Sequence, residues 1–170
     1  MRRAAQRYQL QRQARVVYAA PMDPDIHPEA AVAPGYLANH AMRVFNRAVD
    51  ARLRAHGLTL SLIGPLLLLS WKGAMLQKDM VRASAIKQPA MVALLDKLQA
   101  MGLVSRAVLA SDKRAATVHL TDAGLAAANI GRAALLEANA VGVAGFTDHE
   151  AAALVGLLGK FITNLENATE

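Results

Sequence analysis

The chain of 170 residues contains no cysteine. Disulfide bonds, thiolate metal ligands and cysteine-based redox sensing are therefore excluded. Aromatic residues make up only 4 % and charged residues 19 %, whereas 54 % are hydrophobic, with alanine and leucine dominant. Because alanine and leucine favour helices, this composition predicts a mainly α protein whose apolar residues fill one domain or two small lobes.

Long hydrophobic runs are also missing. The longest apolar stretch, from Leu58 to Trp71, contains Pro65 and is shorter than the about 20 residues that cross a bilayer. It is better interpreted as a buried helix. The N-terminus has arginines but no apolar core of signal-peptide length, so we expect a cytoplasmic protein that makes no membrane contact.

The first 21 residues lack acidic side chains and contain five arginines. Residues 1–35 also hold four of the six prolines, which predicts a basic, proline-rich arm or linker. Met22 could itself be the first residue of the native protein. One hypothesis is therefore that residues 1–21 are not part of the native product.

The net charge of +6 is unevenly distributed. Residues 72–121 carry eight basic and three acidic side chains, whereas residues 122–170 carry two basic and six acidic ones. A basic middle segment favours contact with the phosphates of a nucleic acid. The alternative is a basic face that only meets solvent.

Hydrophobic spacing predicts several helices. The first runs from Tyr36 to His56 and stops at Gly57; the next is capped by Thr59 and bent at Pro65. Two short helices follow at 76–83 and 87–101. Thr121 is expected to cap a long helix to about Val143, loosened by three glycines (Gly131, Gly142 and Gly145), and a capping box of Thr147 and Glu150 opens an amphipathic last helix.

Between the helix at 87–101 and the helix that follows Thr121, the spacing of hydrophobic residues changes to every second residue. Residues 103–110 and 115–120 alternate and are rich in β-formers, with the charged turn Ser111 to Arg114 between them. The sequence therefore predicts a β-hairpin directly after a helix-turn-helix, in the position of a wing.

The helix at 87–101 has the pattern of a recognition helix. Four apolar residues should pack inward: Met91, Leu94, Leu95 and Leu98. The outward set is Ala90, Ala93 and Lys97, with Lys87, Gln88 and Pro89 at the amino end. Gln88 can pair with adenine in the major groove, and the small alanines allow close approach to base edges. The alternative is an ordinary amphipathic surface helix.

The predicted hairpin turn offers a second contact. Lys113 and Arg114 would lie at its tip, where Arg114 can enter a minor groove. Asp112 is repelled by phosphate, so its role is expected to be local, bonding the turn backbone or orienting a cation. A solvent-exposed polar turn is the alternative.

Residues 76–124 resemble the MarR family of bacterial regulators. The matching elements are the "QPAMVALLDKLQAMGLV" helix, the D-x-R wing at Asp112 and Arg114, and the "LT-x-x-G" exit at Leu120, Thr121 and Gly124. The resemblance extends over roughly 36–168. It implies a mainly α fold with a small β-hairpin wing: a winged helix-turn-helix lobe at 58–121 and a helical dimerisation region at 36–57 and 122–168.

The resemblance also implies a function. Family members bind pseudo-palindromic double-stranded DNA as homodimers, commonly as repressors that small phenolic or lipophilic effectors release. The effector pocket lies where the dimerisation helices meet the DNA-binding lobe, and His40, Arg43 and Arg47 are the candidates to face it here. The apolar faces of the outer helices agree with a dimer, because they exceed what one chain can cover.

Some features depart from the family or leave alternatives open. Ala93 stands where many members carry a long polar residue, so a winged-helix module for protein contact or for DNA binding without sequence choice remains the alternative. The histidines are scattered, which predicts no metal site: His27, His40, His56, His119 and His149. No catalytic or cofactor motif stands out, so we expect neither an enzyme nor a cofactor.

Overall fold

The computed structural model describes residues 33–84, 86–109 and 112–168. The chain divides into two units between Ala48 and Val49. The predicted arm, apart from its last three residues, and the hypothesised start at Met22 lie outside the described residues. The first helix, α3, is Pro34–Leu53 and begins two residues before the predicted start. A turn of 3-10 helix, η1 (Arg54–His56), follows and ends at Gly57, whose φ of 66° is the left-handed conformation that glycine adopts most easily.

The long apolar stretch forms the buried helix α4 (Leu60–Lys72), as predicted. Its core side chains are Leu62, Ile63, Pro65, Leu66 and Leu69. The helix continues through Pro65. Among the described residues no single helix is long and apolar enough to cross a membrane, although α3 with η1 and α4 would qualify together as a pair bent by 82°.

The cap of α4 differs from the prediction. Thr59 occupies the N-cap position, but its side chain makes no capping bond and instead lies 2.9 Å from the Ser61 hydroxyl. The Leu60 amide donates to the Asp50 carboxylate oxygen, at 2.7 Å. A side chain from α3 thus satisfies the helix end, and this tertiary contact could not be found from local spacing.

The helix-turn-helix consists of α5 (Gln77–Ala83) and α6 (Gln88–Ala100), close to the predicted ranges. The expected start at residue 76 is wrong, because Met75–Leu76 form a short strand, β1. Met75 pairs with Val118 and Leu76 with Thr117. Sheet pairing with a distant strand therefore overrides the helical pattern at this position.

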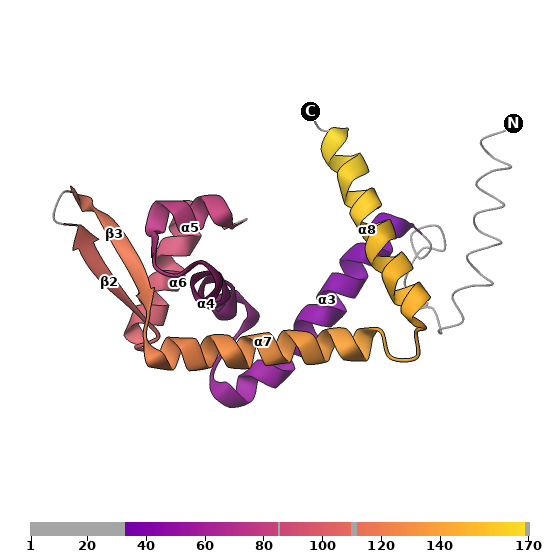
Figure 1. Ribbon diagram of the computed structural model, residues 1–170, viewed down its shortest axis with the longest axis horizontal. Coiled ribbons are helices and arrows are strands. Elements are labelled where there is room, and N and C mark those ends of the chain that lie inside the picture. Colours follow the sequence, from indigo (N-terminus) through magenta and orange to yellow (C-terminus); the bar gives the residue numbers. More distant parts are fainter. Residues whose placement is uncertain (1–32, 85, 110–111, 169–170) are drawn as a thin grey trace, which may run out of the picture. The chain divides into compact units, whose positions relative to one another are not determined.

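The hairpin is present as β2 (Val104–Leu109) and β3 (Asp112–Leu120). With β1 it makes an antiparallel sheet of order β1-β3-β2, so the predicted two-stranded ribbon gains a third strand. Figure 1 shows the hairpin at the N-terminal end of the long helix α7 (Asp122–Gly142). The fold is mainly α with a small β wing, as the sequence predicts.

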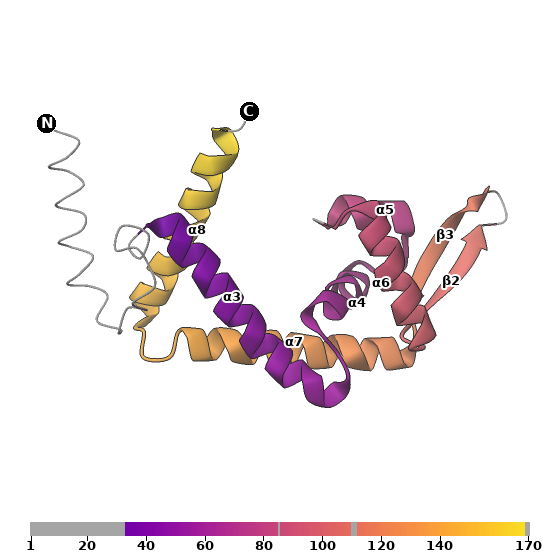
Figure 2. The ribbon, with the colours of Figure 1, turned by 180° about the vertical axis from the view of Figure 1, so that it is seen from behind.

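Helix α7 packs against α4, and Figures 1 and 2 show that the two helices cross and do not run parallel. Gly131 lies at this contact, where an added Cβ would come within 2.9 Å of Ile63 Cβ. The expectation that Gly131 loosens the helix is therefore wrong: α7 runs unbroken to Gly142, and the glycine allows two helices to approach closely.

The last helix, α8 (Asp148–Asn167), begins with the predicted capping box. The Glu150 amide donates to Thr147 Oγ1 at 3.2 Å, and the Thr147 amide donates to the Glu150 carboxylate at 2.8 Å. The bonds from the Thr147 backbone and hydroxyl lower the pKa of Glu150. No residue of α8 is buried, and its apolar stripe is open: Leu154, Val155, Leu158, Ile162 and Leu165.

Candidate nucleic-acid interface

The helix α6 has one buried and one exposed face. Met91, Leu95 and Leu98 are fully buried, as predicted, whereas Leu94 is only half-buried. The predicted outward residues Ala90, Ala93 and Lys97 are all exposed. Because these three follow one another at helical spacing, they form a narrow surface strip of two methyl groups and an ammonium group.

The amino end of α6 is also open to solvent. Lys87 occupies the N-cap position, and Gln88 and Pro89 form the first turn; all three are exposed. Proline is well tolerated in a first turn, because its missing N–H has no partner within the helix there. In the turn before α6, the Ile86 amide donates to Ser84 Oγ at 3.4 Å. The polar and basic residues predicted to lead the helix are thus free to meet another molecule.

The hairpin places Asp112, Lys113 and Arg114 differently from the prediction. They belong to β3 and not to a four-residue turn, because Leu109 pairs with Asp112 and leaves only two residues to connect the strands. The pairing moves from Val108–Ala116 directly to Leu109–Asp112, so an irregularity on β3 accommodates residues 113–115. The side chains at 108–115 lie outside the described residues, so no contact of Arg114 is described.

A junction of short contacts joins α6, β2 and α7. Thr121 Oγ1 donates to the Gly102 carbonyl at 2.7 Å and accepts the Gly124 amide at 3.0 Å. The Thr121 amide donates to the Leu103 carbonyl at 3.2 Å. An added Cβ on Gly124 would overlap this same carbonyl. The "LT-x-x-G" motif is therefore the cap of α7 together with the glycine that lets α7 approach the end of α6.

An ion pair links α6 to the wing. Arg106 Nη2 on β2 lies 2.7 Å from Asp96 Oδ1 on α6, and the Arg106 side chain is 19 % exposed against 62 % for Asp96. Neither residue was among the site residues predicted from the sequence. A signal was available, since Arg106 is the one basic residue within the strand predicted at 103–110.

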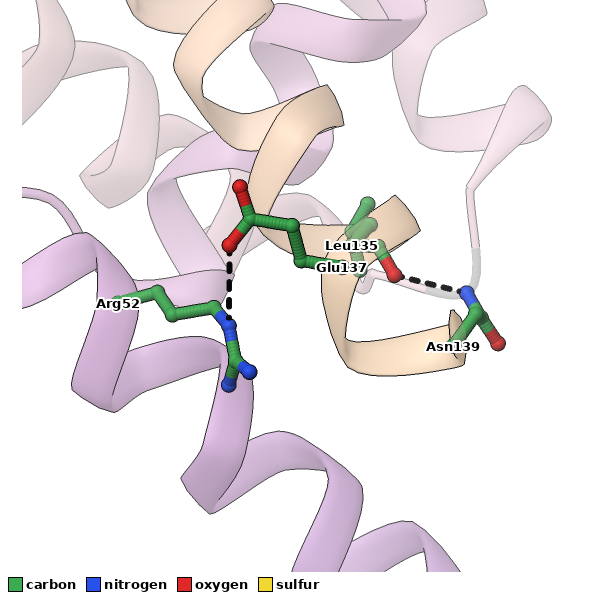
Figure 3. A network of polar contacts seen from close by, with 4 residues as sticks. All are labelled: Arg52, Leu135, Glu137 and Asn139. Atoms are coloured by element: carbon green, nitrogen blue, oxygen red, sulfur yellow. Dashed lines mark hydrogen bonds and ion pairs between the residues drawn. The ribbon is translucent and has the colours of Figure 1, made fainter. Parts of the chain in front are cut away.

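A second pair, Arg52 and Glu137, joins the end of α3 to α7, with Nε 3.3 Å from Oε2 (Figure 3). On the same helix Asn139 donates to the Leu135 carbonyl at 2.9 Å. Both ion-pair partners are partly or largely exposed, so the pair contributes little to stability. It does fix which face of α7 meets the end of α3.

The predicted effector residues share one helix. The rings of Tyr36 and His40 are stacked with centroids 6.2 Å apart, and Arg43 Nη2 lies 3.4 Å from His40 Nδ1. Arg47 continues this face one turn later and is exposed. These residues belong to the unit that ends at Ala48, so the position of a pocket between them and the DNA-binding lobe stays a prediction.

Metal-ligating side chains do not gather in the part of the chain that the structure describes: no three histidine or carboxylate groups lie close enough to hold an ion. His27, one of the five histidines considered, lies outside that part.

No protein-family model matches the chain. Solved structures do. A MarR-family transcriptional regulator from Silicibacter pomeroyi is 27 % identical, with 79 % of this chain and 91 % of that chain covered and a TM-score of 0.64. BpsR from Bordetella bronchiseptica, whose DNA binding is regulated by 6-hydroxynicotinic acid, is 25 % identical, with 75 % and 96 % covered and a TM-score of 0.67.

A third neighbour, MepR from S. aureus in complex with DNA, is 21 % identical, with 78 % and 98 % covered and a TM-score of 0.71, and supports the fold alone. All three neighbours are regulatory or DNA-binding proteins and not enzymes. The likeness spans nearly the full length of each of them. The chain is therefore similar to MarR-family transcriptional regulators and shares their winged-helix fold.

Proposed function

We propose that this protein is a ligand-responsive, DNA-binding transcriptional repressor that binds a pseudo-palindromic operator as a homodimer. The observation that carries the proposal is the exposed strip of α6 beside a β-hairpin in a segment rich in basic residues. A helix with small side chains and a leading glutamine fits a major groove, and an arginine-bearing hairpin fits the adjoining minor groove. DNA lies in the cytoplasm of a bacterial cell, which is the compartment we infer.

The DNA-contacting residues in this proposal are those of α6 and the wing. Gln88 reads base edges, Ala90 and Ala93 allow the helix to approach them, and Lys87 and Lys97 neutralise phosphates, with Pro89 fixing the first turn. On the wing, Arg114 enters the minor groove and Lys113 meets the backbone, while Asp112 orients a neighbouring cation. The DNA binding of BpsR supports a DNA-contacting role for this lobe, whereas the role of each single residue is a prediction.

The homodimer is supported by the apolar stripe of α8. Six large aliphatic side chains of this helix stay exposed, at 39 to 71 % of their full accessible area. A water-soluble helix with such a face is stable only when the face packs against something. A second copy of the same helix supplies a matching surface through a two-fold axis and places two winged-helix lobes on one operator.

Arg114→Ala is expected to weaken operator binding at least about tenfold, because a minor-groove arginine contact is lost. Fluorescence anisotropy with the promoter fragment of the protein's own gene and with random DNA measures it. Lys160→Ala, which removes one cation from α8, is the matched control and should bind as the wild type does. Equal affinity of wild type and Arg114→Ala would remove the wing from the mechanism.

The same titration separates sequence-specific from general binding. A specific regulator should prefer its own promoter to random DNA by about 10³ or more at physiological salt. Equal binding to both would favour the alternative, a winged-helix module without sequence choice. The exposed Ala93 is consistent with that alternative, because a methyl group makes no hydrogen bond to a base. No binding to either would contradict the proposal.

The effector proposal concerns Tyr36, His40, Arg43 and Arg47. A stacked pair of aromatic rings beside a guanidinium group suits a small aromatic acid, because the ring can stack and the carboxylate can pair with arginine. Since 6-hydroxynicotinic acid regulates BpsR, it is the first compound to test within the phenolic or lipophilic class.

Arg43→Gln is expected to raise the concentration of 6-hydroxynicotinic acid that releases half of the DNA by about tenfold, through loss of a charge-assisted bond. Anisotropy of the preformed protein–DNA complex follows the release. Arg54→Gln, an exposed arginine on η1, is the control and should leave the half-release concentration unchanged. A wild-type complex that no concentration of this acid dissociates would contradict the choice of ligand.

A further inference from the structure

We propose that the Asp96–Arg106 ion pair positions the wing against the recognition helix, so that α6 and the hairpin engage one DNA site together. This role rests on the proposed DNA binding and goes beyond it. The two residues are positioning residues: they act on the DNA through the geometry they impose on two elements.

The pair is the charged contact between these elements. Asp96 projects from the exposed side of α6, one residue before Lys97, and Arg106 projects from the middle of β2, where its backbone partner is Val118 on β3. Asp96 Oδ1 and Arg106 Nη2 are 2.7 Å apart. Apart from this ion pair, Arg106 Nε and Nη2 make no hydrogen bond to the described residues.

That burial makes the carboxylate important for Arg106. A guanidinium group that is largely removed from water has to be compensated, and Asp96 is the acidic group that approaches it within the described part of the chain. Without Asp96, Arg106 gains by turning outward to solvent. Such a rotation moves the strand that carries it away from α6, since α6 and β2 pack against one another.

A small movement at Arg106 becomes larger at the end of the hairpin. Strand residues advance about 3.3 Å each, so the end of β2 at Leu109 lies about 10 Å beyond Arg106. Residues 112–114 on β3 follow directly on the connection from there. The ion pair therefore sits near the pivot of the segment that presents the wing cations.

The sign of the effect separates positioning from simple electrostatics. Asp96→Asn removes a negative charge beside the proposed phosphate contact of Lys97, so charge alone predicts tighter DNA binding and a steeper salt dependence. Positioning predicts the opposite, about tenfold weaker binding, because the wing leaves its site. The two expectations differ in direction and not only in size.

The experiment is operator binding combined with hydroxyl-radical footprinting of wild type, Asp96→Asn and Asp96→Glu. Asp96→Asn is expected to lose the protections of the minor groove at the outer edges of the site, while the backbone protections that flank the major groove entered by α6 persist. Asp96→Glu keeps the carboxylate and should restore those protections. Glu137→Gln removes the acid of the Arg52 pair outside the wing and should leave the footprint unchanged.

Urea unfolding of each variant accompanies the footprints and identifies a loss of the folded state. Unchanged wing protections in a folded Asp96→Asn protein, or tighter binding by it, would overturn the positioning role while leaving DNA binding intact. A wild-type protein that protects no DNA would overturn the proposed function and this inference with it. Equal losses in Asp96→Asn and Asp96→Glu would also overturn it, because the carboxylate would then not be the cause.

Discussion

Gly124→Ala is expected to destabilise the winged-helix lobe by about 3 kcal/mol. The alanine Cβ would overlap the Leu103 carbonyl oxygen and come within 2.9 Å of its carbon and 3.0 Å of Leu120 Cδ2. Backbone atoms cannot rotate away as a side chain can. Moving the Leu103 carbonyl would also break its bond from the Thr121 amide. Steric overlap and a lost hydrogen bond therefore add at one position.

Equilibrium urea unfolding, followed by circular dichroism, measures this loss as a lower midpoint. Gly64→Ala is the matched control in the same lobe, since Gly64 is helical and exposed and an added Cβ there meets no atom within 4 Å. That variant should be stabilised by about 0.5–1 kcal/mol, because glycine costs a helix conformational entropy. Equal midpoints for Gly124→Ala and the wild type would show that α7 does not need this close approach.

Leu158→Glu is expected to convert the proposed dimer to monomers. Leu158 lies in the middle of the apolar stripe of α8, and a buried carboxylate without a partner costs several kcal/mol. Two-fold symmetry places the charge in the interface twice. The dissociation constant of the dimer should rise by at least about 10³, and operator affinity should fall with it because only one half-site is held.

Sedimentation equilibrium measures the monomer–dimer balance over a range of protein concentrations. Thr163→Glu introduces the same charge into the same helix, about 140° away from Leu158 on the helical wheel. Thr163 is exposed and lies on the polar side, so this variant should remain dimeric. A Leu158→Glu protein that dimerises as tightly as Thr163→Glu would show that the stripe does not form the interface.

Much of this fold follows from local patterns. The capping box at Thr147, the cap at Thr121 and the end of the first helix at Gly57 were predicted correctly, because each depends on side-chain and backbone chemistry within a few residues. The buried residues Met91, Leu95 and Leu98 were found for the same reason, since helical spacing alone selects them.

Three of the errors involve partners outside the segment from which the prediction was made. Asp50 replaces Thr59 as the partner of the Leu60 amide, ten residues away, and β1 forms only because β3 returns beside it. Gly131 was expected to weaken a helix. Its lack of a side chain instead leaves room for Ile63 of the neighbouring helix. Periodicity within one segment carries no information about such contacts.

The wing was predicted as an element but not in its register. A four-residue turn would have grouped Lys113 and Arg114 at the tip, whereas the observed pairing of Leu109 with Asp112 includes them in a strand. The hairpin register depends on a bulge in β3. The charged residues at this position do not predict that bulge. The roles of the DNA-facing residues and of His40, Arg43 and Arg47 stay predictions.

The absence of buried residues in α8 has a consequence for how the protein assembles. Most of the stability of a helix in a protein comes from packing of its apolar face, and the 20-residue helix α8 has no buried residue. In the proposed homodimer, the apolar stripe of α8 is buried only when two chains associate. Stabilisation of this helix therefore depends on the protein concentration. Apparent stability then rises with protein concentration. Newly made chains at low concentration would present this apolar stripe without its partner, so the fraction of the proposed dimer rises with the rate of synthesis.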